Sequence, residues 1–83
     1  MKEKLGLRIR LARTRRGMKQ AELASRIGIS RNAMSLIEKG TSDPAFSRVQ
    51  KIAEVLKTSL DYLGGRKDED SWVRPAAVTG LVA

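Results

Sequence analysis

Five side chains in the segment 30–39 have the chemistry needed to contact nucleic-acid bases and phosphates. If the segment is a helix, Ala33, Met34 and Ile37 share one arc that faces the core. The opposite arc then carries Arg31, Asn32, Ser35, Leu36 and Lys39. Arg and Asn can each make bidentate hydrogen bonds to base edges, and an exposed Leu can touch a thymine methyl group. We interpret the segment as a short helix that enters a major groove of DNA.

Other kinds of chemistry have little support in the sequence. The chain contains no Cys and no His, which excludes disulfide bonds and removes the two best zinc ligands. It has no Gly-rich phosphate loop and no pair of carboxylates placed for acid–base catalysis. The acidic cluster Asp68, Glu69 and Asp70 lies in a stretch that we expect to be a hinge. We therefore expect neither catalysis nor a metal or other cofactor.

The recognition segment follows a pattern of two helices joined by a tight turn. The first helix of this pattern is predicted over residues 20–27, and Gly28 lets the backbone turn sharply after it. Ala24 is small enough for the two helices to cross closely, and Ser30 is a suitable N-cap for the second helix. The elements needed to position the segment are therefore present around it.

A helix is also predicted upstream, over residues 2–16, with Leu5 and Ile9 on its inner stripe. Leu7 and Leu11 lie on the other side of this helix and would form an exposed apolar pair. Such a pair is either an incidental exposed spot or a contact surface for an apolar segment or a partner chain.

Two further helices are predicted downstream. Pro44 suits the first turn of the fourth helix. The apolar residues of that helix fall on one arc, which we expect to face the core: Phe46, Val49, Ile52, Ala53 and Leu56. Ser59 can cap a short fifth helix over residues 60–63, which Gly64 and Gly65 close. No segment alternates in the manner of a strand, so the fold is predicted to be all-α.

The positive charge is concentrated in one half of the chain. The net charge is +8; residues 1–40 carry eleven Lys or Arg and three Glu, whereas residues 41–83 carry six Lys or Arg and six Asp or Glu. A one-sided basic field attracts polyanions, of which nucleic acid is the usual one. A solvated helical face would have a similar composition, so charge alone does not decide between the two readings.

The chain is expected to hold one domain, residues 1–65, followed by a charged hinge and apolar tail, residues 66–83. The tail is richer in apolar residues than a solvated segment usually is, and those offered for contact are Trp72, Val73, Val78 and Leu81. We expect it to dock on its own domain or on a second subunit. The sequence has no apolar run long enough for a membrane span or a signal peptide, so we expect a cytoplasmic protein.

The stretch Leu5 to Leu63 resembles the lambda-repressor-like helix-turn-helix domains of the phage repressor and Cro type. The resemblance rests on the runs LGLRIRLARTRRGMKQAELASRIGISRNAMSLIEKG and PAFSRVQKIAEVLKTSLDYL. It covers about 60 of the 83 residues, in order and without large gaps. It implies a compact five-helix domain that binds double-stranded DNA.

The resemblance also implies roles for single residues. Gln20 would contact a DNA phosphate, a task suited to a helix N-terminus. Base contacts would fall on Arg31, Asn32 and Leu36. Contacts with the DNA backbone would come from Ser35, Lys39, Thr41 and Ser42, and the charge of Lys19, beside Gln20, is expected to add another. Arg13 and Glu38 would form a largely buried ion pair that positions the recognition helix.

Two positions depart from the pattern of such domains. Lys19 stands where the N-cap of the second helix is usually Ser, Thr or Asn, which forfeits about 1 kcal/mol of capping. It also adds a cation beside the expected phosphate. Ala45 stands where relatives often have Ser, and Asp43 is expected to replace it as the cap, with Pro44 following.

The leading interpretation is a sequence-specific DNA-binding transcriptional regulator, specifically a repressor that binds a palindromic operator as a homodimer. The alternative is an antitoxin or adaptor whose tail binds a protein partner. In that case Leu7, Leu11 and the tail would supply the contact surface.

Overall fold

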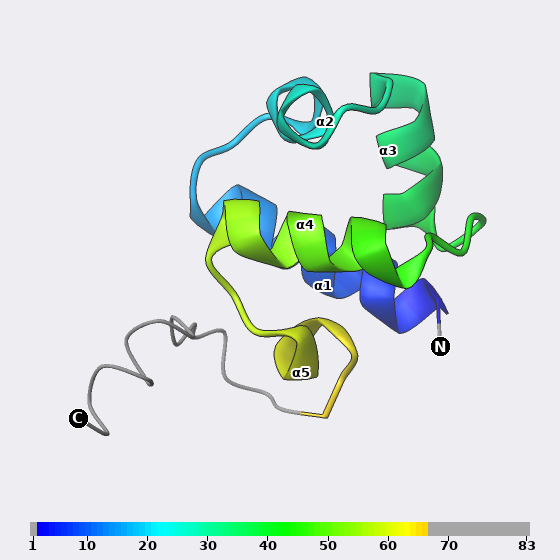
Figure 1. Cartoon of the computed structure of the whole chain (residues 1–83), viewed down its shortest axis with the longest axis vertical. Helices are drawn as coiled ribbons and strands as arrows, with labels where there is room; N and C mark the ends of the chain where they lie inside the picture. The colour runs from blue at the N-terminus through cyan, green and yellow to red at the C-terminus, as the bar shows by residue number, and fades with distance from the viewer. Residues whose placement is uncertain (1, 67–83) are drawn as a thin grey trace.

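The computed structural model describes residues 2–66, which form five α-helices and no strand (Figure 1). The helices are α1 (Lys2–Arg15), α2 (Gln20–Ile27), α3 (Arg31–Lys39), α4 (Phe46–Leu56) and α5 (Leu60–Leu63). The prediction of an all-α, five-helix fold is confirmed. Each of these helices falls short of the length and apolar character that a membrane span requires. The tail residues proposed for contact, Trp72, Val73, Val78 and Leu81, lie outside the described residues.

The other helices are arranged around α1. It packs against α3, α4 and α5, and α2 packs against α3 and α4. Figure 1 shows α2 and α3 on one side of α1 and α4, with α5 on the opposite side. The interior is filled by apolar side chains from all five helices: Ile9, Ala12, Leu23, Ala24, Ile27, Met34, Ile37, Ile52, Ala53, Leu56, Tyr62 and Leu63. A single core therefore holds α2 and α3 in a fixed position on α1.

α1 and α3 approach each other too closely for a side chain at Gly6, a buried residue of α1. A Cβ atom added there would lie 2.6 Å from the carbonyl oxygen of Glu38 and would also collide with the carbonyl oxygen of Ile37. Both contacts are with backbone atoms, so they could be relieved only by moving α3. Gly6 thus allows the close approach of α1 and α3.

α4 begins later than the sequence indicated. Ala45 occupies the N-cap with φ −61° and ψ 153°, and no side chain caps the helix, so the expectation that Asp43 is the cap and Pro44 the first helical residue is wrong. Phe46 is the first residue of α4 and is 67% exposed, which contradicts its predicted inward position. It lies at one edge of the apolar arc and in the first turn, whereas Ile52 lies further along and is fully buried.

Candidate nucleic-acid interface

α2 and α3 are joined by the three-residue turn Gly28, Ile29 and Ser30. Gly28 has φ 79° and ψ 31°, a left-handed conformation that favours glycine, and its N–H donates to the carbonyl oxygen of Ser25 at 3.2 Å. Ser30 Oγ accepts a hydrogen bond from the N–H of Ala33 at 3.0 Å, so Ser30 caps α3 as predicted. Both ends of the turn are therefore set by local sequence.

α3 is buried on one face and open on the other. Met34 and Ile37 are buried, and Ala33 is half-buried. The open face carries Arg31, Asn32, Leu36 and Lys39, which are exposed, and Ser35, which is half-buried. The residue types assigned to base contact from the sequence therefore share one accessible face of a helix.

Two polar clefts lie beside this face. The first, of about 390 Å³, is lined by Gln20, Arg31, Asn32 and Ser35. The second, of about 230 Å³, is lined by Arg10, Arg13, Gln20, Ser35, Glu38 and Lys39. Because Gln20 and Ser35 line both, the two clefts adjoin each other along α3. We call the two adjoining clefts together the recognition cleft.

The inner wall of the recognition cleft is an ion pair with a third partner. Arg13 Nε donates to Glu38 Oε2 at 2.7 Å, and Arg13 Nη2 donates to Glu38 Oε1 at 3.0 Å. A further N–H of the same guanidinium, at Nη1, donates to the carbonyl oxygen of Met18 at 2.9 Å. Gln20 Nε2 donates to Glu38 Oε1 at 3.1 Å. The carboxylate of Glu38 thus ties the C-terminal half of α3 to both α1 and the start of α2.

The contact of Gln20 with Glu38 was not predicted. The sequence interpretation assigned Gln20 only to a phosphate, and the two residues are eighteen positions apart, a separation that no helical or strand period connects. Only the crossing of α2 over α3 brings them together. Gln20 therefore lines the recognition cleft with an amide whose orientation is fixed by a nearly buried carboxylate.

Some of the predicted DNA-contacting residues lie outside the recognition cleft. Lys19 is the N-cap of α2, is exposed, and makes no side-chain capping bond, as its residue type predicted. Thr41 is exposed and its hydroxyl donates to the carbonyl oxygen of Leu36 at 3.1 Å, while Ser42 is half-buried. Leu36 is exposed at the outer surface of α3 but lines neither cleft.

Arg10, for which the sequence indicates no individual role, lines the recognition cleft together with Lys39. Among residues 2–66 its side chain has no hydrogen-bond or ion-pair partner, in contrast to Arg13. Cationic side chains that are accessible and not neutralised by a carboxylate are the groups that neutralise DNA phosphates. The cleft therefore presents positive charge from α1 as well as from α3.

On α1, Leu7 and Leu11 are both exposed, as their positions on the helix away from Leu5 and Ile9 predicted. They do not belong to the recognition cleft. The apolar pair and the polar cleft are thus separate surfaces of the domain.

Comparison with known proteins agrees with the helix-turn-helix arrangement of α2 and α3. The helix-turn-helix family matches residues 9–63. An uncharacterized HTH-type transcriptional regulator of Archaeoglobus fulgidus is 37% identical over 65 residues, which cover 78% of this chain and 93% of that protein.

Two relatives in bacilli are longer than the matched region. The HTH-type transcriptional regulator ImmR of Bacillus subtilis is 37% identical over 67 residues, 81% of this chain and 52% of ImmR. The HTH-type transcriptional regulator SinR of Bacillus licheniformis is 30% identical over 69 residues, 82% of this chain and 62% of SinR. The match spans α2, the turn and α3 together with the core that holds them, and the chain therefore belongs to the lambda-repressor-like helix-turn-helix family of DNA-binding transcriptional regulators.

Proposed function

We propose that the protein is a cytoplasmic transcriptional repressor that binds a palindromic operator as a homodimer. The observation that supports this most directly is the recognition cleft, which combines base-reading residue types on α3 with cations at its edge. In this proposal Arg31, Asn32 and Leu36 contact bases. Contacts with the DNA backbone come from Lys19, Gln20, Ser35, Lys39, Thr41 and Ser42.

The length of α3 supports a dimer. Its nine residues extend about 14 Å, or roughly four base pairs, at a rise of 1.5 Å per residue. Four base pairs recur too often in a genome to define one site. Two copies with recognition helices about 34 Å apart would read two half-sites on one face of the duplex. Repression then requires only that the dimer occupy a promoter, whereas activation requires a further contact with polymerase.

The proposal is tested by selection from a random pool of double-stranded DNA at two salt concentrations. We expect enrichment of a short palindrome, and loss or change of that sequence preference for Arg31→Ala and Asn32→Ala. Lys51→Ala, an exposed substitution on α4 outside the recognition cleft, is the matched control and should select the same palindrome. Binding that is unselective and falls steeply with salt for every variant would argue against an operator-specific regulator.

A second candidate is an antitoxin or adaptor that acts through a protein partner. The exposed pair Leu7 and Leu11 on α1 favours it, because it is an apolar spot outside the DNA-facing surface. The same selection identifies an adaptor, which would enrich no sequence; an antitoxin whose domain also represses its promoter would enrich one, and is distinguished by its binding to a protein partner. For the adaptor, replacing both leucines with Gln would abolish partner binding and leave DNA binding unchanged.

A further inference from the structure

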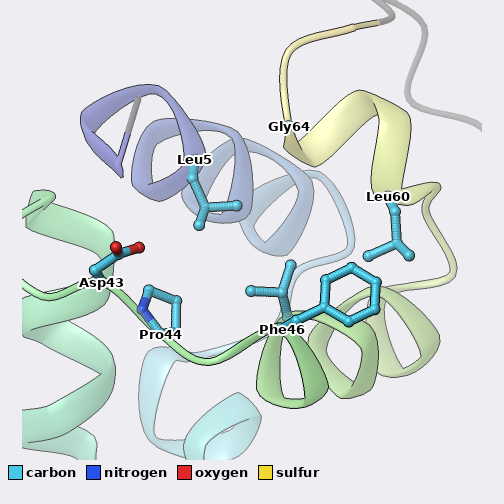
Figure 2. A pocket seen from close by; sticks show the side chains of 7 residues that line it. Leu5, Asp43, Pro44, Phe46, Leu60 and Gly64 are labelled. Atoms are coloured by element: carbon cyan, nitrogen blue, oxygen red, sulfur yellow. The ribbon is translucent and has the colours of Figure 1, made fainter.

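An apolar groove lies between α1, α4 and α5, away from the recognition cleft. Figure 2 shows side chains from all three helices converging on it: Leu5 from α1, Phe46 from α4 and Leu60 from α5. Val49 and Pro44 complete the apolar lining, and Asp43 lies at the edge. Its volume is about 320 Å³, which is within the range of sites that hold a drug-sized group.

Two of the apolar side chains that line the groove are exposed to solvent, although their helices contribute to the core. Phe46 is 67% exposed and Leu60 is 37% exposed, yet both point into the same hollow rather than standing alone on the surface. Single exposed apolar residues are ordinary, whereas a concave cluster marks a binding surface. An aromatic side chain would suit the hollow, because it buries a large apolar area with few rotatable bonds.

The chain itself leaves the described region beside this groove. Gly64 lines it, and Gly65 packs against the side chain of Lys4. The single tryptophan of the protein, Trp72, follows Arg66 by six residues. Six residues can span about 20 Å when extended. Gly64, which lines the groove, is only two positions before Arg66. Trp72 can therefore reach the groove.

The charges at the edge of the groove are complementary to those of the C-terminal segment. Asp43 at the edge of the groove has no ion-pair or hydrogen-bond partner among residues 2–66. In the sequence, Trp72 is followed two positions later by Arg74 and preceded by the acidic run 68–70. With Trp72 in the groove, Arg74 would be close enough to reach Asp43, and the acidic run would pass near Lys4, where the chain leaves the domain.

We propose that the groove binds the chain's own C-terminal segment, with Trp72 inserted between Phe46 and Leu60 and Arg74 paired with Asp43. This docking does not depend on DNA binding. It specifies which of the apolar surfaces of the domain the segment uses, namely the groove rather than the Leu7–Leu11 pair on α1.

Tethering favours the chain's own segment over that of a second copy. A short linker holds a segment at an effective concentration on the order of millimolar. At micromolar protein concentration, the C-terminal segment of another molecule could displace the tethered segment only if it bound the groove much more tightly. The docked state is therefore expected to be independent of protein concentration.

Trp72 reports on its own environment because the chain has one tryptophan. In the full chain we expect blue-shifted emission and slow quenching by acrylamide, both unchanged on dilution. Leu60→Gln should shift the emission to the red and raise the quenching rate severalfold. Leu11→Gln is the matched control, because Leu11 is also 37% exposed, and it should change neither quantity. Phe46→Ser, at a more exposed position, provides a second test if Leu60→Gln lowers the helix content measured by circular dichroism.

A charge reversal tests the register of the segment. Asp43→Arg alone and Arg74→Glu alone should each raise the quenching rate of Trp72, and the two together should restore it. Emission like that of free tryptophan in the unaltered protein would overturn the proposal. So would a red shift with Leu11→Gln but not with Leu60→Gln, and so would shielding that is lost on dilution, which would instead assign the groove to a second copy.

Discussion

Arg13 and Glu38 face each other across the interface of α1 and α3, with Arg13 Nε 2.7 Å from Glu38 Oε2. Their side chains are 12% and 4% exposed. Glu22 and Arg26 on α2 form an ion pair at a similar distance, 2.9 Å, but are 46% and 54% exposed. The two pairs have similar shortest distances, but Arg13 makes a second hydrogen bond to Glu38, from Nη2 to Oε1 at 3.0 Å, and its pair is far less exposed to solvent. Both differences make stability depend more on the Arg13–Glu38 pair.

We predict that Glu38→Ala lowers the free energy of unfolding by about 3 kcal/mol, because it leaves the Arg13 guanidinium nearly buried without its carboxylate. Glu22→Ala should lower it by no more than about 0.5 kcal/mol, since its pair is solvated on a helix surface. Urea unfolding of both variants measures the difference. If both variants lost the same free energy of unfolding, the buried Arg13–Glu38 pair would matter no more for stability than the exposed Glu22–Arg26 pair.

Gly6→Ala is predicted to destabilise the protein even though Ala favours helix by about 1 kcal/mol over Gly. The added methyl group would meet the backbone oxygens of Ile37 and Glu38, so we expect a net loss of at least about 2 kcal/mol. Gly17→Ala is the control. Gly17 has φ 66° and nothing within 4 Å of a Cβ, so the loss there should be only the conformational cost of about 1 kcal/mol. A stabilised Gly6→Ala variant would contradict the close approach of α1 and α3.

Lys57→Gly is predicted to stabilise the protein by about 0.5–1 kcal/mol. Lys57 is the C-cap of α4 and has φ 54° and ψ 51°, a left-handed conformation that costs a residue with a Cβ about 1–2 kcal/mol. The greater freedom of glycine in the unfolded chain offsets part of this gain. The same substitution at Lys51, an exposed position within α4, should instead destabilise by about 1 kcal/mol. Thermal unfolding of the two variants should give shifts of opposite sign.

The ends of α3 could be predicted from the sequence because each depends on nearby residues. Ser30 caps the helix through an amide three positions away, and Gly40 ends it in a left-handed conformation, φ 80°. Arg31 and Asn32 were placed on an open face by helical period alone. The family resemblance supplied the pairing of Arg13 with Glu38, which no local period could indicate.

The misplaced start of α4, with Ala45 and not Asp43 at the N-cap, is a local error, whereas the other errors and omissions concern contacts between helices. Whether Phe46 is covered depends on how far α1 and α5 extend over the first turn of α4, and helical period does not contain that information. The hydrogen bond from Gln20 to Glu38 exists because α2 crosses α3 at one particular angle. The clearance at Gly6 depends on the same kind of crossing, between α1 and α3. These features can be seen only once the helices are packed together, so the sequence pattern alone could not predict them.

Thr58→Val is predicted to stabilise the protein by about 1 kcal/mol. Thr58 is fully buried, and its Oγ1 has no hydrogen-bond partner in the described part of the chain. A buried hydroxyl without a partner is unfavourable, and Val has nearly the same shape without it. Thr14→Val is the comparison, because Thr14 Oγ1 is exposed and donates to the carbonyl oxygen of Arg10 at 2.9 Å, so no gain is expected. A loss of stability in Thr58→Val would indicate that the hydroxyl has a partner after all, such as a buried water.

The proposed DNA contacts of Lys39 and Arg31 should differ in kind, and salt dependence separates them. If Lys39 neutralises one phosphate, Lys39→Ala should reduce the slope of log K against log salt by about 0.9 and weaken binding to operator and random DNA alike. Arg31→Ala should lower the preference for operator over random DNA, at a cost of about 1–3 kcal/mol, because a bidentate contact to a base is lost. Lys51→Ala removes the same charge as Lys39→Ala, but from α4 outside the recognition cleft, and should leave both slope and preference unchanged. If Lys51→Ala changed the slope as much as Lys39→Ala, the effect would belong to the net charge of the protein, and Lys39 would have no specific place on the DNA backbone.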